Sequence, residues 1–297
     1  MKRSVAFSLS LCLLVFCLAG CNATNPAEGS TSGNVPHTTL QNKGSDTMVN
    51  LALYWAEHYQ TDHPEARISV TGGGSGTGIS ALISNTVDIA NASRAIKEEE
   101  IEQALQNGVE PVEQVVARDA IAVIVHPQNP IQQLTLQQVS DIYTRRVHNW
   151  KELGGEDRPI VLLSRETNSG THVYFLESVI RLGNEEDKTL FSPETLLLPS
   201  SEGIIAEVRE NPNAIGYDGL GYITPEVKVI ALAAKPGGEY ILPSIETVNS
   251  NQYPIARDLY MYTNGQPAGF VKTYLDWILS PDGQAIVKEL GFVPVQL

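Results

Sequence analysis

The stretch "RISVTGGGSGTGISALIS", residues 67–84, decides the fold class of this chain. Residues 67–71 predict a β-strand because β-branched side chains dominate them. A run of glycines follows, and Ile79, Leu82 and Ile83 then recur at the spacing of a helix. A strand that passes through a glycine turn directly into a helix is typical of α/β folds.

The same alternation of strands and helices continues along the chain. Apolar stripes at helical spacing predict helices within residues 46–60 and 171–180. Further strands, several of them β-branched, are predicted at residues 87–90, 120–125, 159–163, 227–232 and 259–263. We therefore expect an α/β architecture with mixed or mainly parallel sheets, in which ligands lie at the carboxyl ends of the strands.

Composition excludes several classes of function. A chain of 297 residues with 42% hydrophobic residues is long enough for two packed domains. Its formal net charge of −14 argues against a nucleic-acid or anionic-lipid surface, since both require basic patches. An anionic ligand would gain no long-range attraction from such a surface, so any anion site must work through local hydrogen bonds.

The first 38 residues predict export and anchoring. Residues 1–20 have a basic start and an apolar run, and "LAGC" places Cys21 where a lipoprotein signal peptidase would leave it for lipid attachment. An ordinary signal peptide in which Cys21 is incidental is the alternative. All three cysteines lie within this segment, so no thiol remains for a disulfide or for catalysis in the folded body. Residues 21–38, rich in small and polar residues, are predicted to be a flexible tether.

Three strand-to-helix turns carry small hydroxyl residues and glycines. The first is "KGSDTM", residues 43–48, the second is the glycine run around Ser75, and the third is "SRETNSGT", residues 164–171. In the third turn Arg165 precedes Ser169, Gly170 and Thr171 at a helix start, where amides and hydroxyls favour an oxyanion. Each turn alone is more simply explained by helix capping. Their coincidence, and the entropic cost of so many glycines, favour an anion site.

Other motifs do not fit these residues. No lysine lies between Lys43 and Lys97, which excludes a P-loop in the glycine run. The spacing Gly76-x-Gly78-x-x-Ala81 meets a loose dinucleotide fingerprint, but weakly. There is neither a Gly-x-Ser-x-Gly elbow nor a His-Glu-x-x-His helix, and the six histidines are scattered, so no catalytic base, metal cluster or cofactor site is predicted. His172 alone lies near the third turn, as a rim residue or as an exposed helical one.

Five ordered motifs carry a family resemblance. They are "GSDTMV", "TGGGSGTGISALISNTVDIANASR", "DAIAVIVHPQNP", "SRETNSGTHVYF" and "NPNAIGYDGLGYI". In this order they resemble the phosphate-binding proteins of phosphate-specific ABC transporters, over residues 40–297. The resemblance implies the two-lobed type II periplasmic-binding-protein fold, in which two crossing strands form a hinge and the lobes close on one phosphate. The implied lobes are residues 39–125 with 226–297, and residues 126–225, with crossings at "AIAVIVHP" and near "AIGYDGLGYI".

The resemblance also implies ligand residues. It assigns phosphate donors to Thr47 and the Met48 amide, with Ser45 as a further donor, and to Ser75, Arg165, Ser169, Gly170 and Thr171. The match breaks after "DIA", where some relatives carry an aspartate that accepts the phosphate proton and this chain has Asn91, Ala92, Ser93 and Arg94. Asp46 could replace that acceptor or merely cap the first helix. Ser93 is a candidate donor, and Arg94 either pairs with a carboxylate or faces the ligand.

The expected function is capture without chemistry. The resemblance implies a monomeric extracytoplasmic lipoprotein that needs no cofactor and delivers phosphate to the transmembrane permease subunits of an ABC transporter. A binding protein for molybdate, tungstate or sulfate would share the lobes without needing an acceptor at Asp46. An exported phosphatase would instead hydrolyse a chromogenic phosphate ester. Phosphate sensing without transport is a further alternative.

Overall fold

The computed structural model describes residues 38–295, so Cys21, the leader and all of the predicted tether except Thr38 lie outside the described residues. The strands are β1 (Thr38–Gly44), β2 (Ala66–Thr71), β3 (Ile89–Ala92), β4 (Pro111–Val125), β5 (Gln133–Thr135), β6 (Val161–Arg165), β7 (Leu196–Leu198), β8 (Ala214–Gly219), β9 (Lys228–Val229), β10 (Ala231–Ala233) and β11 (Ala256–Asn264). The α-helices are α1 (Val49–Asp62), α2 (Ser75–Ile83), α3 (Glu98–Gln106), α4 (Leu136–Tyr143), α5 (Gly170–Phe175), α6 (Ser201–Glu210), α7 (Ile245–Asn249), α8 (Gly269–Ile278) and α9 (Pro281–Glu289). Short helical turns are η1 (Asp46–Met48), η2 (Trp150–Leu153), η3 (Leu176–Ile180) and η4 (Leu220–Tyr222).

The predicted α/β architecture is confirmed, with a mixed sheet. Within the described residues the strand order is β2-β1-β3-β11-β4-β8-β6-β7, with β9 also on β4. β1 pairs in parallel with β2 and β3, β6 pairs in parallel with β7 and β8, and β11 is antiparallel to both of its neighbours. Parallel strands place their carboxyl ends at one edge of the sheet, which is where a ligand site is expected.

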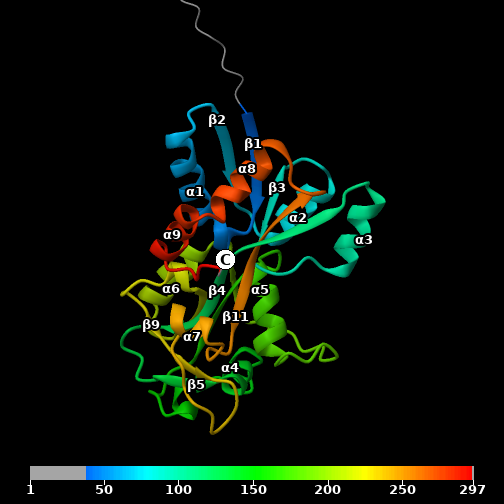
Figure 1. The fold of residues 1–297 in the computed structure, drawn as a ribbon. Coiled ribbons are helices and arrows are strands. Elements are labelled where there is room, and N and C mark those ends of the chain that lie inside the picture. The colour runs from blue at the N-terminus through cyan, green and yellow to red at the C-terminus, as the bar shows by residue number, and fades with distance from the viewer. Residues whose placement is uncertain (1–37, 296–297) are drawn as a thin grey trace, which may run out of the picture. The chain divides into compact units, whose positions relative to one another are not determined.

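Two long strands connect the halves of the sheet. Residues 111–120 of β4 pair with β11, and residues 121–125 pair with β8. β4 and β11 therefore run between the group of helices around α1, α2 and α8 and the group around α4, α5 and α7 (Figure 1). This arrangement is the two-lobed fold with a pair of crossing strands that the sequence predicted.

The second crossing lies later in the chain than the sequence suggested. The segment near "AIGYDGLGYI" forms β8 and η4, and β8 pairs with β4 and β6 rather than returning to β1–β3. Residues beyond 226 still pack in the second half, where Ile230, Leu232 and Ile255 share a core cluster with Leu134. The return is made by β11, because its nine residues hydrogen-bond along β4 from Ala120 to Pro111.

Local predictions mostly hold. Each predicted strand region holds a strand, but β4 begins at residue 111 rather than 120, and the strand predicted at residues 227–232 is divided into β9 and β10. α1 buries the apolar stripe of Leu51, Ala52, Trp55, Ala56 and Tyr59. β1 was not predicted, since "TTLQNKG" holds one apolar residue, the fully buried Leu40. Among the helices of residues 38–295, none is long and apolar enough to cross a bilayer.

Candidate functional site

Hydroxyl groups from three turns of the first half of the sheet meet at the ends of β1, β2 and β3. Ser45 Oγ donates to Ser93 Oγ at 3.0 Å, and the Ser93 amide donates to Ser75 Oγ at 3.0 Å. All three serines are buried. Gly170 of α5 lies against this cluster, because a Cβ added there would overlap the Ser75 and Ser93 hydroxyl oxygens. The two halves of the sheet therefore contribute to one site.

Contacts between the halves continue around this cluster. Thr47 Oγ1 lies 2.7 Å from Thr171 Oγ1. The Asn168 side chain donates to the Gly73 carbonyl at 2.9 Å, and the Gly76 amide donates to the Asn168 carbonyl at 3.1 Å. Gly74 has a φ of 95°, and a Cβ there would lie 2.8 Å from the Asn168 carbonyl oxygen. The glycine run thus serves close approach across the site.

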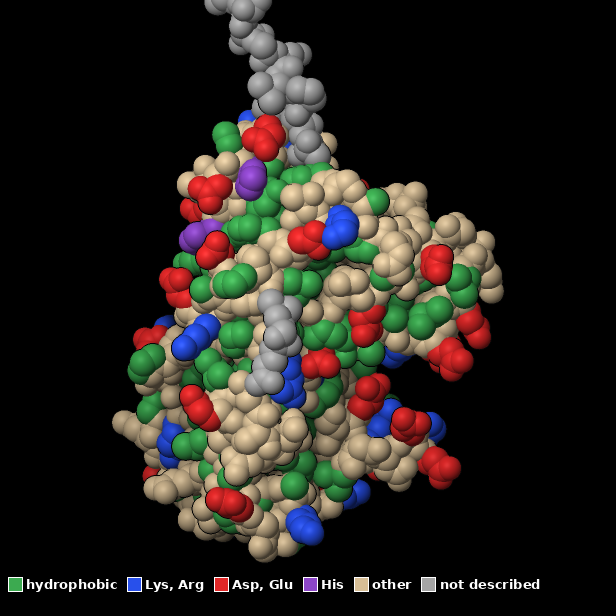
Figure 2. Space-filling model, in the orientation of Figure 1, with side chains coloured by type: hydrophobic (Ala, Val, Ile, Leu, Met, Phe, Trp, Pro, Cys, Tyr) green, Lys and Arg blue, Asp and Glu red, His purple; other side chains and the backbone are tan. Residues whose placement is uncertain are grey.

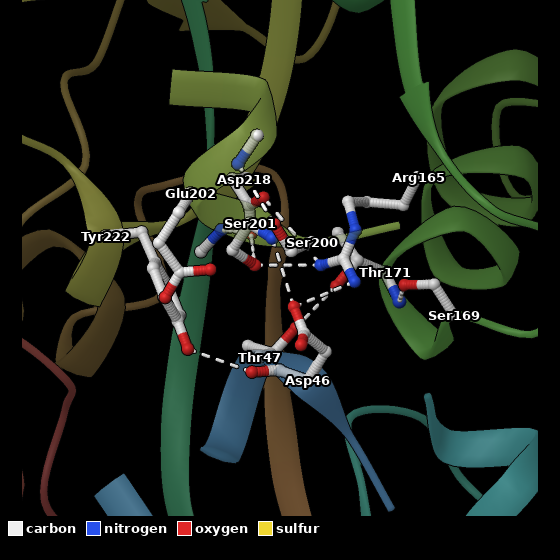
Figure 3. A network of polar contacts seen from close by, with 12 residues as sticks. Asp46, Thr47, Arg165, Ser169, Thr171, Ser200, Ser201, Glu202, Asp218 and Tyr222 are labelled. Carbon is white, nitrogen blue, oxygen red and sulfur yellow. Dashed lines mark hydrogen bonds and ion pairs between the residues drawn. The ribbon is translucent and has the colours of Figure 1, made fainter. Parts of the chain in front are cut away.

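Arg165 is a buried cation of this region, with 1% of its side chain exposed. Its Nη1 donates to Ser201 Oγ at 2.7 Å, and its Nη2 donates to the Pro199 carbonyl at 2.9 Å and lies 2.9 Å from Asp46 Oδ2 (Figure 3). The Nε proton has no partner among the described residues. Since a guanidinium carries five N–H donors, Arg165 retains donors for a ligand.

Asp218 supports Arg165 through Ser201. The Ser201 hydroxyl accepts from Arg165 and donates to Asp218 Oδ1 at 2.9 Å, while Asp218 Oδ2 lies 3.9 Å from Arg165 Nη1 (Figure 3). The carboxyl group is fully buried. Burial raises the pKa of Asp218 from 3.8 to about 6, although the neighbouring Arg165 guanidinium opposes that shift.

We expect Asp218 to make stability depend on pH. Its pKa is higher in the folded protein than in the unfolded chain, so its contribution is fully present below pH 3.8 and is lost as the pH rises through about 6. Asp218→Asn keeps an oxygen acceptor and cannot titrate. The unsubstituted protein should lose stability from this group between pH 4 and 7. In Asp218→Asn that loss in the free energy of unfolding should be smaller by on the order of 3 kcal/mol, and chemical denaturation at each pH measures it. The exposed Asp276→Asn is the control, and an unchanged pH profile in Asp218→Asn would contradict the assignment.

Asp46 does not cap the first helix. The structure gives η1 no side-chain cap, and Asp46 Oδ2 instead accepts from the Ser201 amide at 3.0 Å and pairs with Arg165. Its backbone carbonyl accepts from the Tyr222 hydroxyl at 2.8 Å (Figure 3). Asp46 therefore connects the two halves of the sheet through its Oδ2 and its backbone carbonyl, and its Oδ1 takes part in none of these contacts.

Ser169 and Met48 are placed differently from the other candidates. Ser169 Oγ accepts from the Thr171 amide at 3.2 Å and so caps α5, which leaves its hydroxyl proton available. The Met48 side chain is fully buried in the core, and its amide donates to the Ser45 carbonyl at 3.1 Å. In this structure the tight turn of η1 therefore uses the Met48 amide, which was expected to be a phosphate donor.

The open alternatives for Arg94 and His172 are also decided. Arg94 pairs with Glu100 through both guanidinium ends, at 2.8 Å and 2.6 Å. His172 is buried, its Nδ1 lies 3.0 Å from Ser164 Oγ, and its ring lies 4.6 Å from that of Phe191. Burial lowers the pKa of His172, which keeps the ring neutral near pH 7. Arg94 therefore belongs to a structural ion pair, and His172 contacts Ser164, the residue before Arg165 on β6.

Sequence reasoning missed several buried charged or polar residues at the site. Arg257 and Asp119 face each other on β11 and β4, with Arg257 Nη2 at 2.9 Å from Asp119 Oδ2, and Arg257 also donates to Thr171 Oγ1 at 2.9 Å. Ser201 and Asp218 were missed as well. A charged residue inside an otherwise apolar strand is rarely buried without a partner, and that pattern in "ARDAIAV" and "ARDLYMY" was the available signal.

The described residues hold no metal cluster, and the face drawn in Figure 2 is not basic. Among residues 38–295, no group of three or more His, Cys, Asp and Glu side chains is arranged to hold a metal ion. Figure 2 shows acidic side chains spread over the face drawn, with Lys and Arg dispersed among them. Local donors, rather than a basic surface, would have to hold an anion here.

Comparisons with known proteins agree on one family. The PBP superfamily domain matches residues 24–282. The phosphate-binding protein PstS of Pseudomonas aeruginosa is 34% identical over 273 residues, covering 86% of this chain and 83% of that protein. The phosphate-binding protein PstS of Bacillus subtilis is 30% identical over 303 residues, covering 99% and 95%.

Solved structures give the same result. A phosphate ABC transporter substrate-binding protein with bound phosphate from Clostridium perfringens matches with a TM-score of 0.78 and 32% identity, over 87% of this chain and all of that one. An ABC-type phosphate transport receptor from Vibrio cholerae matches with a TM-score of 0.69 and 27% identity, over 86% of this chain and all of that one.

Proposed function

This chain belongs to the phosphate-binding proteins of the PBP superfamily, and from that membership we propose that it captures inorganic phosphate between its lobes for an ABC transporter. One observation carries the proposal: buried hydroxyl groups from both halves of the sheet meet beside a buried arginine that retains donors. Such a site can exchange the hydration shell of an oxyanion for fixed dipoles.

The donors are divided between the lobes. Ser45, Thr47, Ser75 and Ser93 belong to the first, and Arg165, Ser169 and Thr171 belong to the second. Their hydroxyl groups are neutral, so they disperse the charge of phosphate without requiring a matching set of cations. Because Gly170 lets the second lobe approach Ser75 and Ser93, closure completes the set of donors. Capture needs no catalytic step.

Asp46 is proposed as the acceptor for the phosphate proton. Phosphate keeps at least one proton near neutral pH, whereas sulfate is fully ionised. Asp46 Oδ2 is held by Arg165 and the Ser201 amide, and Oδ1 remains to accept a proton from the ligand. A carboxylate in that place would meet an unprotonated sulfate oxygen with repulsion and an unpaired acceptor.

Asp46→Asn should therefore reduce the preference for phosphate over sulfate. The amide removes the charge and can donate to a sulfate oxygen, so we expect about a tenfold or larger fall in the ratio of the two affinities. Calorimetric titration with each anion measures the ratio. Asp276→Asn, at an exposed site, is the matched control. An unchanged ratio in Asp46→Asn would place the acceptor elsewhere.

The lobe boundaries that we propose follow the observed packing. Residues 38–120 and 256–295 form the first lobe, and residues 121–255 form the second, since β4 changes partner after Ala120 and Ile255 packs in the second core cluster. The crossing strands β4 and β11 would then bend as the lobes open and close.

We also propose an extracytoplasmic location on a lipid anchor. Cleavage after residue 20 would leave Cys21 for lipid attachment, and residues 22–37 would join the anchor to the fold. The mature chain would carry 18 basic and 34 acidic side chains, a formal charge of −16, because Lys2 and Arg3 are lost. A monomer facing the transmembrane permease subunits is the expected working form.

Calorimetric titration tests the function. The protein, freed of bound ligand, is offered phosphate, sulfate and molybdate in turn. Tight one-to-one binding of phosphate alone supports the proposal, whereas preference for another oxyanion would overturn the substrate and keep the fold. Turnover of a chromogenic phosphate ester would show an enzyme instead.

A further inference from the structure

Arg257 connects the two crossing strands to both lobes. It lies on β11 with 5% of its surface exposed. Its Nη1 donates to the Ser93 carbonyl at 2.8 Å, and its Nη2 donates to Thr171 Oγ1 at 2.9 Å. Its Nε and Nη2 donate to Asp119 Oδ2 at 3.3 Å and 2.9 Å. One guanidinium therefore contacts, in each lobe, a residue that is a proposed phosphate donor.

Asp119 fixes this guanidinium at the hinge. Asp119 and Arg257 are paired in register across β4 and β11, one residue before the point where β4 exchanges β11 for β8. Asp119 Oδ1 also accepts from the Leu220 amide at 3.0 Å, just after β8. Since the Asp119 carboxylate neutralises Arg257, the arginine adds little long-range attraction for an anion and acts instead through its hydrogen bonds.

The direction of those hydrogen bonds determines what Thr171 can do. A guanidinium only donates, so Thr171 Oγ1 must be the acceptor of the bond from Arg257. The hydroxyl has one proton, which is then directed away from Arg257. Thr47 Oγ1, at 2.7 Å, either accepts that proton or donates its own to Thr171, and in the second case the Thr171 proton is left for a ligand. Thr171 is thereby fixed as a donor.

We propose that Arg257 is a positioning residue that holds the Thr171 hydroxyl as a donor to the bound anion and ties this donor to the hinge through Asp119. The inference rests on the proposed phosphate function. A donor fixed in this way selects an unprotonated oxygen of the ligand, while an acceptor carboxylate on the other side selects the protonated one. Arg257 thus contributes to specificity without contacting the ligand.

A double-mutant cycle tests the proposal in the full chain. Arg257→Gln and Asp119→Asn are introduced together, so that no unpaired charge is buried. This double replacement is made in two proteins, one that keeps Thr171 and one that carries Thr171→Val. We expect the pair replacement to weaken phosphate binding about tenfold when Thr171 is present and less than twofold in the Thr171→Val protein. Calorimetry gives each affinity, and thermal unfolding without phosphate gives the stability of each variant.

Arg257→Lys provides a second measurement if the double replacement does not fold. Lysine keeps the charge beside Asp119 but lacks the planar fork that reaches Asp119 and Thr171 together, so it should show the same Thr171-dependent loss. Equal losses in both Thr171 backgrounds, or no loss with Thr171 present, would overturn the positioning role. Absence of phosphate binding by the unsubstituted protein would instead overturn the proposed function itself.

Discussion

Arg165→Ala is expected to weaken phosphate binding by roughly 30- to 4,000-fold, which corresponds to about 2–5 kcal/mol for one partner of a buried charged contact. Arg165 is a buried cation paired with Asp46, the residue before Thr47, and its Nε is unpaired among the described residues. Its removal also leaves Asp46 without its guanidinium, so that negative charge would face the incoming anion, and it removes the group that opposes the rise in the pKa of Asp218. Calorimetric titration measures the loss.

Stability must be separated from binding in this variant. Arg145→Ala is the matched control, because Arg145 pairs with Glu194 at 2.6 Å and bonds the Ile160 carbonyl at 2.8 Å, away from the proposed donors. Both variants should unfold at lower temperature, and only Arg165→Ala should lose phosphate. A folded Arg165→Ala protein with unchanged affinity would remove this residue from the site.

Gly170→Ala is expected to prevent full closure of the lobes. The added methyl group would overlap the hydroxyl oxygens of Ser75 and Ser93, which belong to the other lobe. Overpacking of this kind costs about 1–3 kcal/mol, so phosphate affinity should fall roughly 5- to 150-fold. Small-angle scattering at saturating phosphate should show a more open protein than the unsubstituted one.

The control for this variant is a glycine away from the site. A Cβ at Gly108, just after α3, would meet no atom within 4 Å, although its φ of 72° favours glycine. Gly108→Ala should therefore close normally and bind phosphate with nearly unchanged affinity, even if the strained backbone lowers its stability. If Gly170→Ala also binds and closes normally, the contact between α5 and the serine cluster is not required for capture. The unfolding temperature of Gly170→Ala without phosphate should change little, because the overlap arises only where the lobes meet.

The sequence alone determined the α/β architecture and most of the candidate donors. Strands and helices were visible because their signals are local: β-branched runs such as residues 67–71, and apolar residues recurring along α1. The hydroxyl and glycine turns were visible for the same reason, since each lies where a strand meets a helix. β1 was missed because only Leu40 marks it as buried, while its neighbours β2 and β3 supply the hydrogen bonds that make it a strand.

Only the tertiary structure decided how distant residues are paired. Asp46 and Arg165 are 119 positions apart, from 46 to 165, and no periodicity relates them. Their ion pair shows that Asp46 is a charged partner of Arg165 rather than a helix cap. The same is true of Asp119 and Arg257, which become neighbours only because β4 and β11 align in register. Local patterns report the burial and backbone preference of each segment, whereas hydrogen-bond partners depend on where the chain returns. The sequence therefore specified which chemistry this protein carries, and the crossing of β4 and β11 decided which groups act together.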